Sequence, residues 1–260
     1  MAQVTVGVSL KAYFGHERAR VWFDEVAARV RTHDAVASGA VELFITPTYL
    51  QVLPALAAFA GTSVRIGGQD VSSEEPGAFT GEVTAAELAE VGATIAEIGH
   101  AERRRLFGET DQATAAKTRV ALRSGLTPLL CIGETEGQEP EDAAIVAVAQ
   151  VHSALEDADA GAVIVAYEPV WAIGAPEPAG YEHIRVVTAA LRAAIDADPA
   201  RAGSVVIYGG AAGPGLLTEL RDAVDGVFLG RFAHDPDALV TVLDEAAALA
   251  DLRRGQGEAG

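Results

Sequence analysis

Val163-Ile164-Val165-Ala166-Tyr167, followed directly by Glu168-Pro169, is the stretch that decides the fold. Its apolar residues continue without the alternation of a half-exposed strand, as in a parallel strand that helices cover on one face and a core covers on the other. The stretch Val205-Val206-Ile207 repeats this pattern and leads into Gly209-Gly210. Both stretches predict buried parallel strands that end in a charged residue or a glycine turn.

Similar short runs of β-branched residues recur along the chain, and segments with helical spacing separate them. The eight candidate strands are residues 4–9, 42–45, 64–68, 94–98, 127–132, 163–167, 204–208 and 226–229. Apolar stripes that predict helices are Trp22, Val26 and Val30, then Ile145, Val148, His152 and Leu155, and then Ile184, Val187, Leu191 and Ile195. This alternation indicates the α/β class, and it fits a closed (β/α)8 barrel and a doubly wound open sheet equally well.

The length bounds the number of domains. The chain has 260 residues, close to the ~250 of a typical βα barrel and near the size at which one core stops growing. We therefore expect one domain over residues 1–252 and a flexible tail at residues 253–260. The richest glycine cluster, residues 209–215, neither reads G-x-G-x-x-G nor follows the first strand, so a dinucleotide-binding fold loses support.

The net charge and the rare residue types limit which partners and which cellular location we expect. A net charge of −18 argues against nucleic acid and anionic membrane surfaces, because both repel an acidic protein. Of the 19 basic residues only Lys11 and Lys117 are lysines, so a lysine at a strand end needs an explanation. Cys131 is the only cysteine, and no run approaches the ~18 apolar residues of a membrane span. We expect a cytoplasmic protein without disulfides.

Three strand ends carry side chains that suit proton transfer. In a βα barrel the active site lies at the carboxyl ends of the strands, and there the sequence places Lys11, His100 and Glu168. Each of them alone has a commoner role, as a solvated charge or a satisfied histidine. Gly209-Gly210 and Gly230 follow the last two strands, where bare backbone N–H groups can approach an anion such as phosphate.

Two blocks of sequence are specific enough to indicate a family. The first is Ile98-Gly99-His100-Ala101-Glu102-Arg103-Arg104 continuing to Phe107-Gly108-Glu109-Thr110-Asp111, and the second is Ala166-Tyr167-Glu168-Pro169-Val170-Trp171-Ala172-Ile173-Gly174. Shorter matches are Gly77-Ala78-Phe79-Thr80-Gly81-Glu82, Cys131-Ile132-Gly133-Glu134, Tyr208-Gly209-Gly210 and Val224-Asp225-Gly226. From Val4 to about Leu249 the chain resembles the triose-phosphate isomerase family, which implies a closed (β/α)8 TIM barrel.

The resemblance implies an aldose–ketose isomerase, an intramolecular oxidoreductase that needs neither a metal nor an organic cofactor. Glu168 would move a proton between neighbouring carbons of a small sugar phosphate. His100 would polarise the carbonyl, and Lys11 would stabilise the developing oxyanion. Glu102 resembles the family's acidic neighbour of the catalytic histidine and would act either as a structural salt-bridge partner of the basic site or directly in the chemistry. Residues 169–180 would form a mobile lid that excludes water from the reaction.

The resemblance also implies the remaining site residues and a partner. The substrate-binding set is Ser9, Lys11, Gly174, Ala211, Gly230 and Arg231, and the supporting set is Glu102, Tyr208, Gly209 and Gly210. The loop Gly77-Ala78-Phe79-Thr80-Gly81-Glu82 carries an exposed-looking aromatic residue and resembles the family's interlocking loop. We therefore expect a homodimer formed through this loop.

Several positions depart from the family pattern. Ser9 stands where the common enzyme has asparagine, and Ala101 and Ala211 each replace a serine. The loss at Ala101 concerns the resting position of the catalytic glutamate, and the loss at Ala211 removes a hydroxyl near the phosphate. The far hinge of the lid, residues 176–179, reads Pro-Glu-Pro-Ala and is expected to be stiffer than usual.

Two further departures add charge. Arg231 occupies the second glycine of the phosphate turn after the last strand, and Glu97 lies inside a strand where the family is apolar. A buried glutamate needs a partner or a raised pKa. Together these changes are similar to a branch of the family that isomerises four-carbon erythrulose phosphates.

Three functions compete at this point. The leading interpretation is the triose-phosphate isomerase of glycolysis and gluconeogenesis, which interconverts dihydroxyacetone phosphate and glyceraldehyde 3-phosphate. The second is the same chemistry on erythrulose phosphate, and the third is a catalytically silent barrel that binds a phosphate ligand. The direction of Arg231 separates the first two. An inward guanidinium suits a phosphate displaced by one extra carbon, and an outward one leaves a triose-sized pocket.

Overall fold

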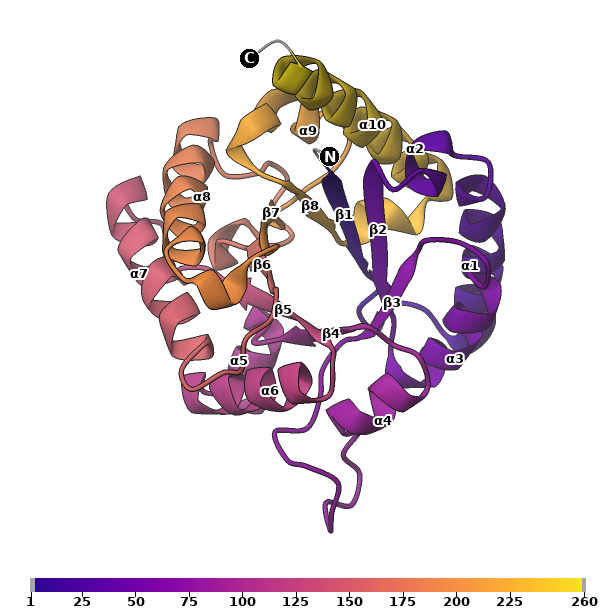
Figure 1. The fold of residues 1–260 in the computed structure, drawn as a ribbon, viewed down its shortest axis with the longest axis vertical. Coiled ribbons are helices and arrows are strands. Elements are labelled where there is room, and N and C mark those ends of the chain that lie inside the picture. The colour runs from indigo at the N-terminus through magenta and orange to yellow at the C-terminus, as the bar shows by residue number, and fades with distance from the viewer. Residues whose placement is uncertain (1–2, 259–260) are drawn as a thin grey trace.

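The computed structural model describes residues 3–258 of the chain and shows eight parallel strands closed into a barrel in the order of the sequence (Figure 1). The strands are β1 (Val4–Ser9), β2 (Val41–Thr46), β3 (Arg65–Gly68), β4 (Ile95–Ile98), β5 (Thr127–Ile132), β6 (Ile164–Tyr167), β7 (Val205–Tyr208) and β8 (Gly226–Leu229). Pairing of β1 with β8, for example Val6 with Val227, closes the ring. The predicted α/β class is confirmed, and the closed barrel is correct over the open sheet.

Helices surround the barrel on its outside (Figure 1). They are α1 (His16–Val30), α2 (Asp34–Ala37), α3 (Tyr49–Ala58), α4 (Ala85–Glu90), α5 (Ala101–Phe107), α6 (Asp111–Arg123), α7 (Pro140–Ala154), α8 (Tyr181–Asp196), α9 (Leu216–Leu220) and α10 (Pro236–Glu258). Short 3-10 turns are η1 (Val170–Ala172), η2 (Pro199–Arg201), η3 (Arg221–Ala223) and η4 (Arg231–His234). In this arrangement the carboxyl ends of all eight strands meet at one rim.

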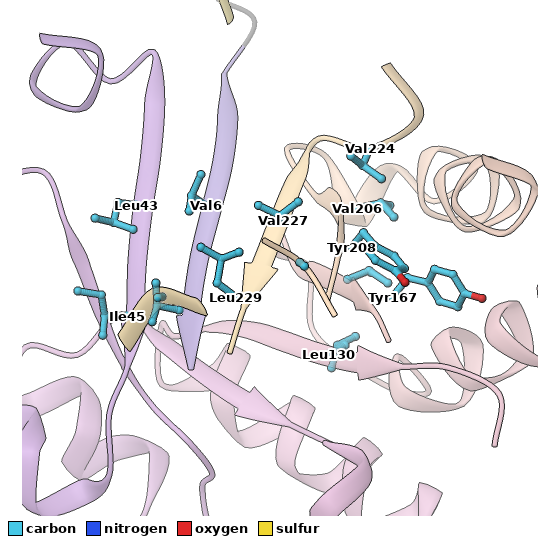
Figure 2. Packing of buried hydrophobic residues seen from close by; sticks show 14 of the residues in the cluster. Val6, Leu43, Ile45, Leu130, Tyr167, Val206, Tyr208, Val224, Val227 and Leu229 are labelled. Carbon is cyan, nitrogen blue, oxygen red and sulfur yellow. The ribbon is translucent and has the colours of Figure 1, made fainter. Parts of the chain in front are cut away.

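Each strand has two buried faces, and this explains the unbroken apolar runs. Side chains alternate along a strand, so Val6, Leu43 and Leu130 point outward and pack under the helices (Figure 2). Their neighbours Phe44 and Leu129 belong to a separate cluster inside the barrel. A Cβ at Gly7 would come within 2.1 Å of the Phe44 ring, so glycine is needed there for the ring to fill the interior.

Two expectations about α7 and the chain end need correction. In α7 the predicted stripe is only partly correct, because Val148 and Leu155 pack against the core but Ile145 is 69% exposed, while Ala147 and Val151 are fully buried. The small alanine side chains let the helix approach the barrel closely, so they define the buried face. At the chain end, α10 continues to Glu258, and the guanidinium of Arg253 donates to the Val224 carbonyl at 2.6 Å. The boundary predicted at 252/253 therefore lies within a helix, and residues 259–260 lie outside the described residues.

The segment between β3 and α4 leaves the barrel as a long projecting loop (Figure 1). Residues 74–82 within it are all exposed, and Phe79 keeps 43% of its surface accessible. The backbone at both ends of the projection is held, because Ser72 N–H donates to the Val83 carbonyl at 2.8 Å. Within residues 3–258, no helix combines the length and apolar character needed to cross a membrane.

Candidate active site

A pocket of about 230 Å³ opens at the carboxyl ends of the strands. This volume lies below the ~300 Å³ at which drug-sized ligand sites begin, so it suits a small molecule. Ten of the residues predicted for the site line it, and they are Ser9, Lys11, His100, Glu102, Glu168, Gly174, Gly209, Ala211, Gly230 and Arg231. Residues from β1, β4, β6, β7 and β8 thus meet in one cavity.

The two other predicted residues lie behind the pocket wall. Tyr208 is fully buried, and its hydroxyl accepts the Ala179 N–H at 2.9 Å, which fixes the end of the loop after β6. A Cβ at Gly210 would come within 2.6 Å of that same hydroxyl, so the backbone there packs directly against Tyr208. Both residues support the loop from behind instead of touching the cavity.

Lys11 projects into the pocket from a strained backbone. Its φ of 45° lies in the left-handed region, which costs a residue with a Cβ of the order of 1–3 kcal/mol. The side-chain amide of Gln69 donates to the Lys11 carbonyl at 2.9 Å and holds this conformation. The Lys11 ammonium donates to Glu102 Oε1 at 2.8 Å. Burial lowers the pKa of Lys11, but the carboxylates of Glu102, Glu168 and Glu97 together raise it above its ordinary value, so the cation persists.

His100 presents one defined ring nitrogen to the cavity. It caps the start of α5, where the backbone N–H of Glu102 donates to its Nδ1 at 3.1 Å. Because Nδ1 accepts this hydrogen bond, the neutral ring carries its proton on Nε2. Burial opposes protonation of the ring, but the neighbouring Glu168 carboxylate overcomes it and raises the pKa of His100.

Glu168 follows β6 directly and faces His100. Its Oε2 lies 3.5 Å from His100 Nε2, and only 5% of the residue is exposed. Among the described residues, Glu168 Oε1 and His100 Nε2 have no hydrogen-bond partner. A buried polar atom without a hydrogen-bond partner costs free energy, so a ligand that provides partners for these two atoms binds favourably here. A carboxylate, an imidazole and an ammonium group therefore face one small cavity.

The opposite wall is built mainly from backbone. Gly174, Gly209 and Gly230 expose their main chain to the cavity, and Ala211 adopts a positive φ of 48°. Arg231 also lines the cavity, and its Nη2 lies 3.7 Å from the position that a Cβ on Gly174 would occupy. The guanidinium therefore lies beside the loop after β6 at the rim of the pocket, where Arg231 remains exposed to solvent.

Glu97, the glutamate predicted to lie inside a strand, is buried and has two hydrogen-bond partners. It is 3% exposed, and its Oε2 accepts hydrogen bonds from Thr46 Oγ1 at 2.7 Å and from Ser9 Oγ at 3.2 Å. Burial raises the pKa of Glu97 to about 7. The unusual serine at position 9 and the unusual glutamate at position 97 are thus direct partners.

Two buried networks that hold the site were not predicted. Glu134 is fully buried and accepts hydrogen bonds from Tyr167 Oη at 3.1 Å and Trp171 Nε1 at 2.7 Å, with His183 Nε2 at 3.2 Å. This network anchors the start of the loop after β6. The only signal in the sequence was that Glu134 and Trp171 both lie in motifs shared with the family.

The second network explains the other lysine. Lys117 Nζ contacts Asp70 Oδ1 at 2.6 Å and Glu109 Oε2 at 2.5 Å, and Arg103 bridges the same two carboxylates. Glu109 Oε1 also accepts the Gly99 N–H at 2.9 Å. Since Gly99 precedes His100, these charges fix the position of the histidine. The rarity of lysine in the chain was the available clue.

Comparisons with known proteins agree with this geometry. A family model described as triosephosphate isomerase matches residues 4–246. L-erythrulose-1-phosphate isomerase from Pectobacterium atrosepticum is 44% identical over 95% of this chain and 97% of that protein. Triosephosphate isomerase from Leifsonia xyli subsp. xyli is 42% identical over 76% of this chain and 80% of that protein.

A solved structure shows the same fold. The crystal structure of triosephosphate isomerase from Bartonella henselae superposes with a TM-score of 0.80 and 26% identity, covering 94% of this chain and 98% of that one. One family is indicated by three observations: the closed barrel, the order of the motifs, and the family-model match over nearly the whole chain. The chain belongs to the triosephosphate isomerase family and is an isomerase.

Proposed function

We propose that the protein isomerises a four-carbon ketose phosphate of the L-erythrulose 1-phosphate type. The observation that carries this proposal is the place of Arg231, which lines the pocket with its guanidinium beside Gly174. A guanidinium with five donors can bind a phosphate that one extra carbon displaces from the backbone N–H groups. The 44% identity to an L-erythrulose-1-phosphate isomerase over almost the full length supports the same substrate.

The proposed chemistry uses Lys11, His100 and Glu168, which lie across the pocket from Arg231. The Glu168 carboxylate takes a proton from the carbon beside the carbonyl, and the C–H electron pair shifts to form an enediolate. The ammonium of Lys11 and the Nε2–H of His100 stabilise the oxygen that becomes negative. Glu168 then returns the proton to the neighbouring carbon, while His100 transfers a proton between the two oxygens. Atoms and charge balance without any further reactant.

The triose reaction is the second candidate. The catalytic side chains do not depend on the length of the substrate, and a pocket of about 230 Å³ also accepts a three-carbon sugar phosphate. The 42% identity to the Leifsonia triosephosphate isomerase favours this alternative. It ranked first from the sequence, and the position of Arg231 moves it to second place.

A turnover assay on both substrates decides between the two. We expect kcat/KM for L-erythrulose 1-phosphate to exceed kcat/KM for glyceraldehyde 3-phosphate by about a hundredfold, or about 2.7 kcal/mol of transition-state binding. A preference of similar size for the triose would reverse the order of the two candidates. If neither compound is turned over, the result would instead favour a catalytically silent barrel that binds a phosphate ligand.

We also propose that the protein works as a homodimer through the loop Gly77–Glu82. The aromatic side chain of Phe79 is 43% exposed at the end of a projecting loop, and such exposed apolar groups mark interaction sites. Sedimentation at micromolar concentration should give a dimer, and Phe79→Asp should shift it toward monomer. A monomeric wild-type protein at that concentration would contradict the proposal.

A further inference from the structure

Glu97 is an acidic side chain where the interior of the barrel meets the pocket. It lies on β4 two residues after Ile95, which belongs to the apolar cluster inside the barrel, so both side chains face the interior. Its hydrogen-bond partners Ser9 and Thr46 are the last residues of β1 and β2. The ion pairs found in residues 3–258 include none with Glu97, so these two hydroxyls are the groups that contact its carboxyl oxygen directly.

The hydrogen bond from Ser9 to Glu97 determines which group Ser9 can offer to a substrate. A serine hydroxyl has one proton and two acceptor lone pairs. The proton of Ser9 points to Glu97 Oε2, and the hydroxyl of Thr46 approaches the same oxygen more closely, at 2.7 Å. Ser9 lines the pocket although it is only 2% exposed. While Glu97 is ionised, Ser9 Oγ can therefore offer the pocket only an acceptor.

We infer that Glu97 is a positioning residue which fixes Ser9 as a hydrogen-bond acceptor, so that the pocket selects a substrate with one more hydroxyl group than a triose phosphate. An acceptor at this position repels a carbonyl or enediolate oxygen and binds an O–H donor. Arg231 binds the displaced phosphate at the other wall. Ser9 Oγ accepts a hydrogen bond from the hydroxyl group on the added carbon. This inference rests on the proposed four-carbon substrate and names the group that recognises it.

The protonation of Glu97 gives the inference a pH dependence. Burial raises the pKa of Glu97 to about 7, His100 and Lys11 lower it, and Glu168 raises it. Burial, Glu168 and Glu97 raise the pKa of the nearby Cys131 thiol, so this thiol stays neutral beside the carboxyl groups. Above pH 7 the carboxylate accepts the Ser9 proton. Below pH 7 the protonated carboxyl group can donate to Ser9, whose own proton is then free to turn into the pocket. Selection for the extra hydroxyl should therefore weaken as the pH falls through about 7.

Four variants of the full-length protein test this inference. In each, the ratio of kcat/KM for L-erythrulose 1-phosphate to kcat/KM for glyceraldehyde 3-phosphate is measured well above pH 7. Glu97→Leu removes the acceptor and Ser9→Ala removes the hydroxyl, so each should lower this ratio at least about tenfold. Thr46→Val removes the other donor to Glu97 and leaves the Ser9 contact, so its ratio should stay near the wild-type value.

Glu97→Gln separates positioning from a structural role. Its amide oxygen can still accept the Ser9 proton, but the group does not titrate near pH 7. We expect this variant to keep the wild-type ratio above pH 7 and to lose the fall in that ratio below pH 7. A merely structural glutamate would show no such change in the pH profile.

The outcomes separate the inference from the proposed function. If the wild type does not turn over the four-carbon compound, the proposed function falls and this inference falls with it. If the wild type prefers that compound but Ser9→Ala leaves the ratio unchanged, only the inference is overturned. Should Glu97→Leu fail to fold, Ser9→Ala and the pH profile of Glu97→Gln decide the matter without it.

Discussion

The two walls of the pocket are built in different ways. On the side of β1, β4 and β6, the groups proposed to react are the side chains of Lys11, His100 and Glu168, and hydrogen bonds with Glu102 hold Lys11 and His100. On the side of β7 and β8, the wall is mainly glycine backbone, with Arg231 added. Proton transfer needs side chains with a set protonation state, whereas a phosphate can be bound by N–H groups alone. We therefore expect substitutions at Lys11, His100 and Glu168 to affect turnover of any substrate, and substitutions on the backbone wall to affect mainly substrate binding.

The largest effect should come from the side-chain wall. Glu168→Gln keeps the volume of the side chain but cannot accept a proton, so we expect kcat to fall by at least ~10²–10⁴-fold on any substrate. Thermal unfolding should be close to that of the wild type. Glu182→Gln is a matched control, because Glu182 contacts only Arg185 on the surface of α8. Wild-type turnover in Glu168→Gln would show that the base lies elsewhere.

A second variant tests whether the two walls are mechanically independent. A Cβ on Gly209 would come within 2.6 Å of Glu168 Cγ, so Gly209→Ala should displace the base from the backbone wall. Displacement of a catalytic group by about 1 Å can reduce the rate about 10²-fold, and we expect a loss of that size in kcat. Gly137→Ala serves as control, since nothing lies within 4 Å of its added Cβ. An unchanged kcat for Gly209→Ala would mean that Glu168 relaxes without cost.

The smallest effect should appear on the backbone wall. Arg231→Gly leaves only backbone N–H groups for the phosphate, and we expect a loss of about tenfold in kcat/KM for the four-carbon substrate, mainly through KM. The triose reaction should change less, because its phosphate reaches the backbone directly. Arg123→Gln removes the same charge from an exposed position and controls for net charge. Equal losses on both substrates would show that Arg231 does not distinguish chain length.

The strands were predictable because their signal is local. An apolar run without alternation needs only its own residues to indicate two buried faces, and all eight predicted strands agree with β1 to β8 to within one residue at each end. The stripe on α7 was only partly correct for the opposite reason. Val148 and Leu155 pack against the core as predicted, but Ile145 is exposed, and alanines form much of the buried face. Hydrophobicity alone does not reveal how closely a helix must approach its neighbours.

The sequence by itself determined the closed barrel through its family resemblance, and it placed a cation, an imidazole and a carboxylate at the strand ends. Only the tertiary structure decided that Arg231 lines the pocket, that Nδ1 of His100 accepts a backbone hydrogen bond, and that Ser9 and Glu97 are partners across 88 residues. Protonation states and side-chain directions depend on distances of a few ångströms between groups far apart in the chain. Closure of the barrel sets those distances, and no local pattern of residues encodes them.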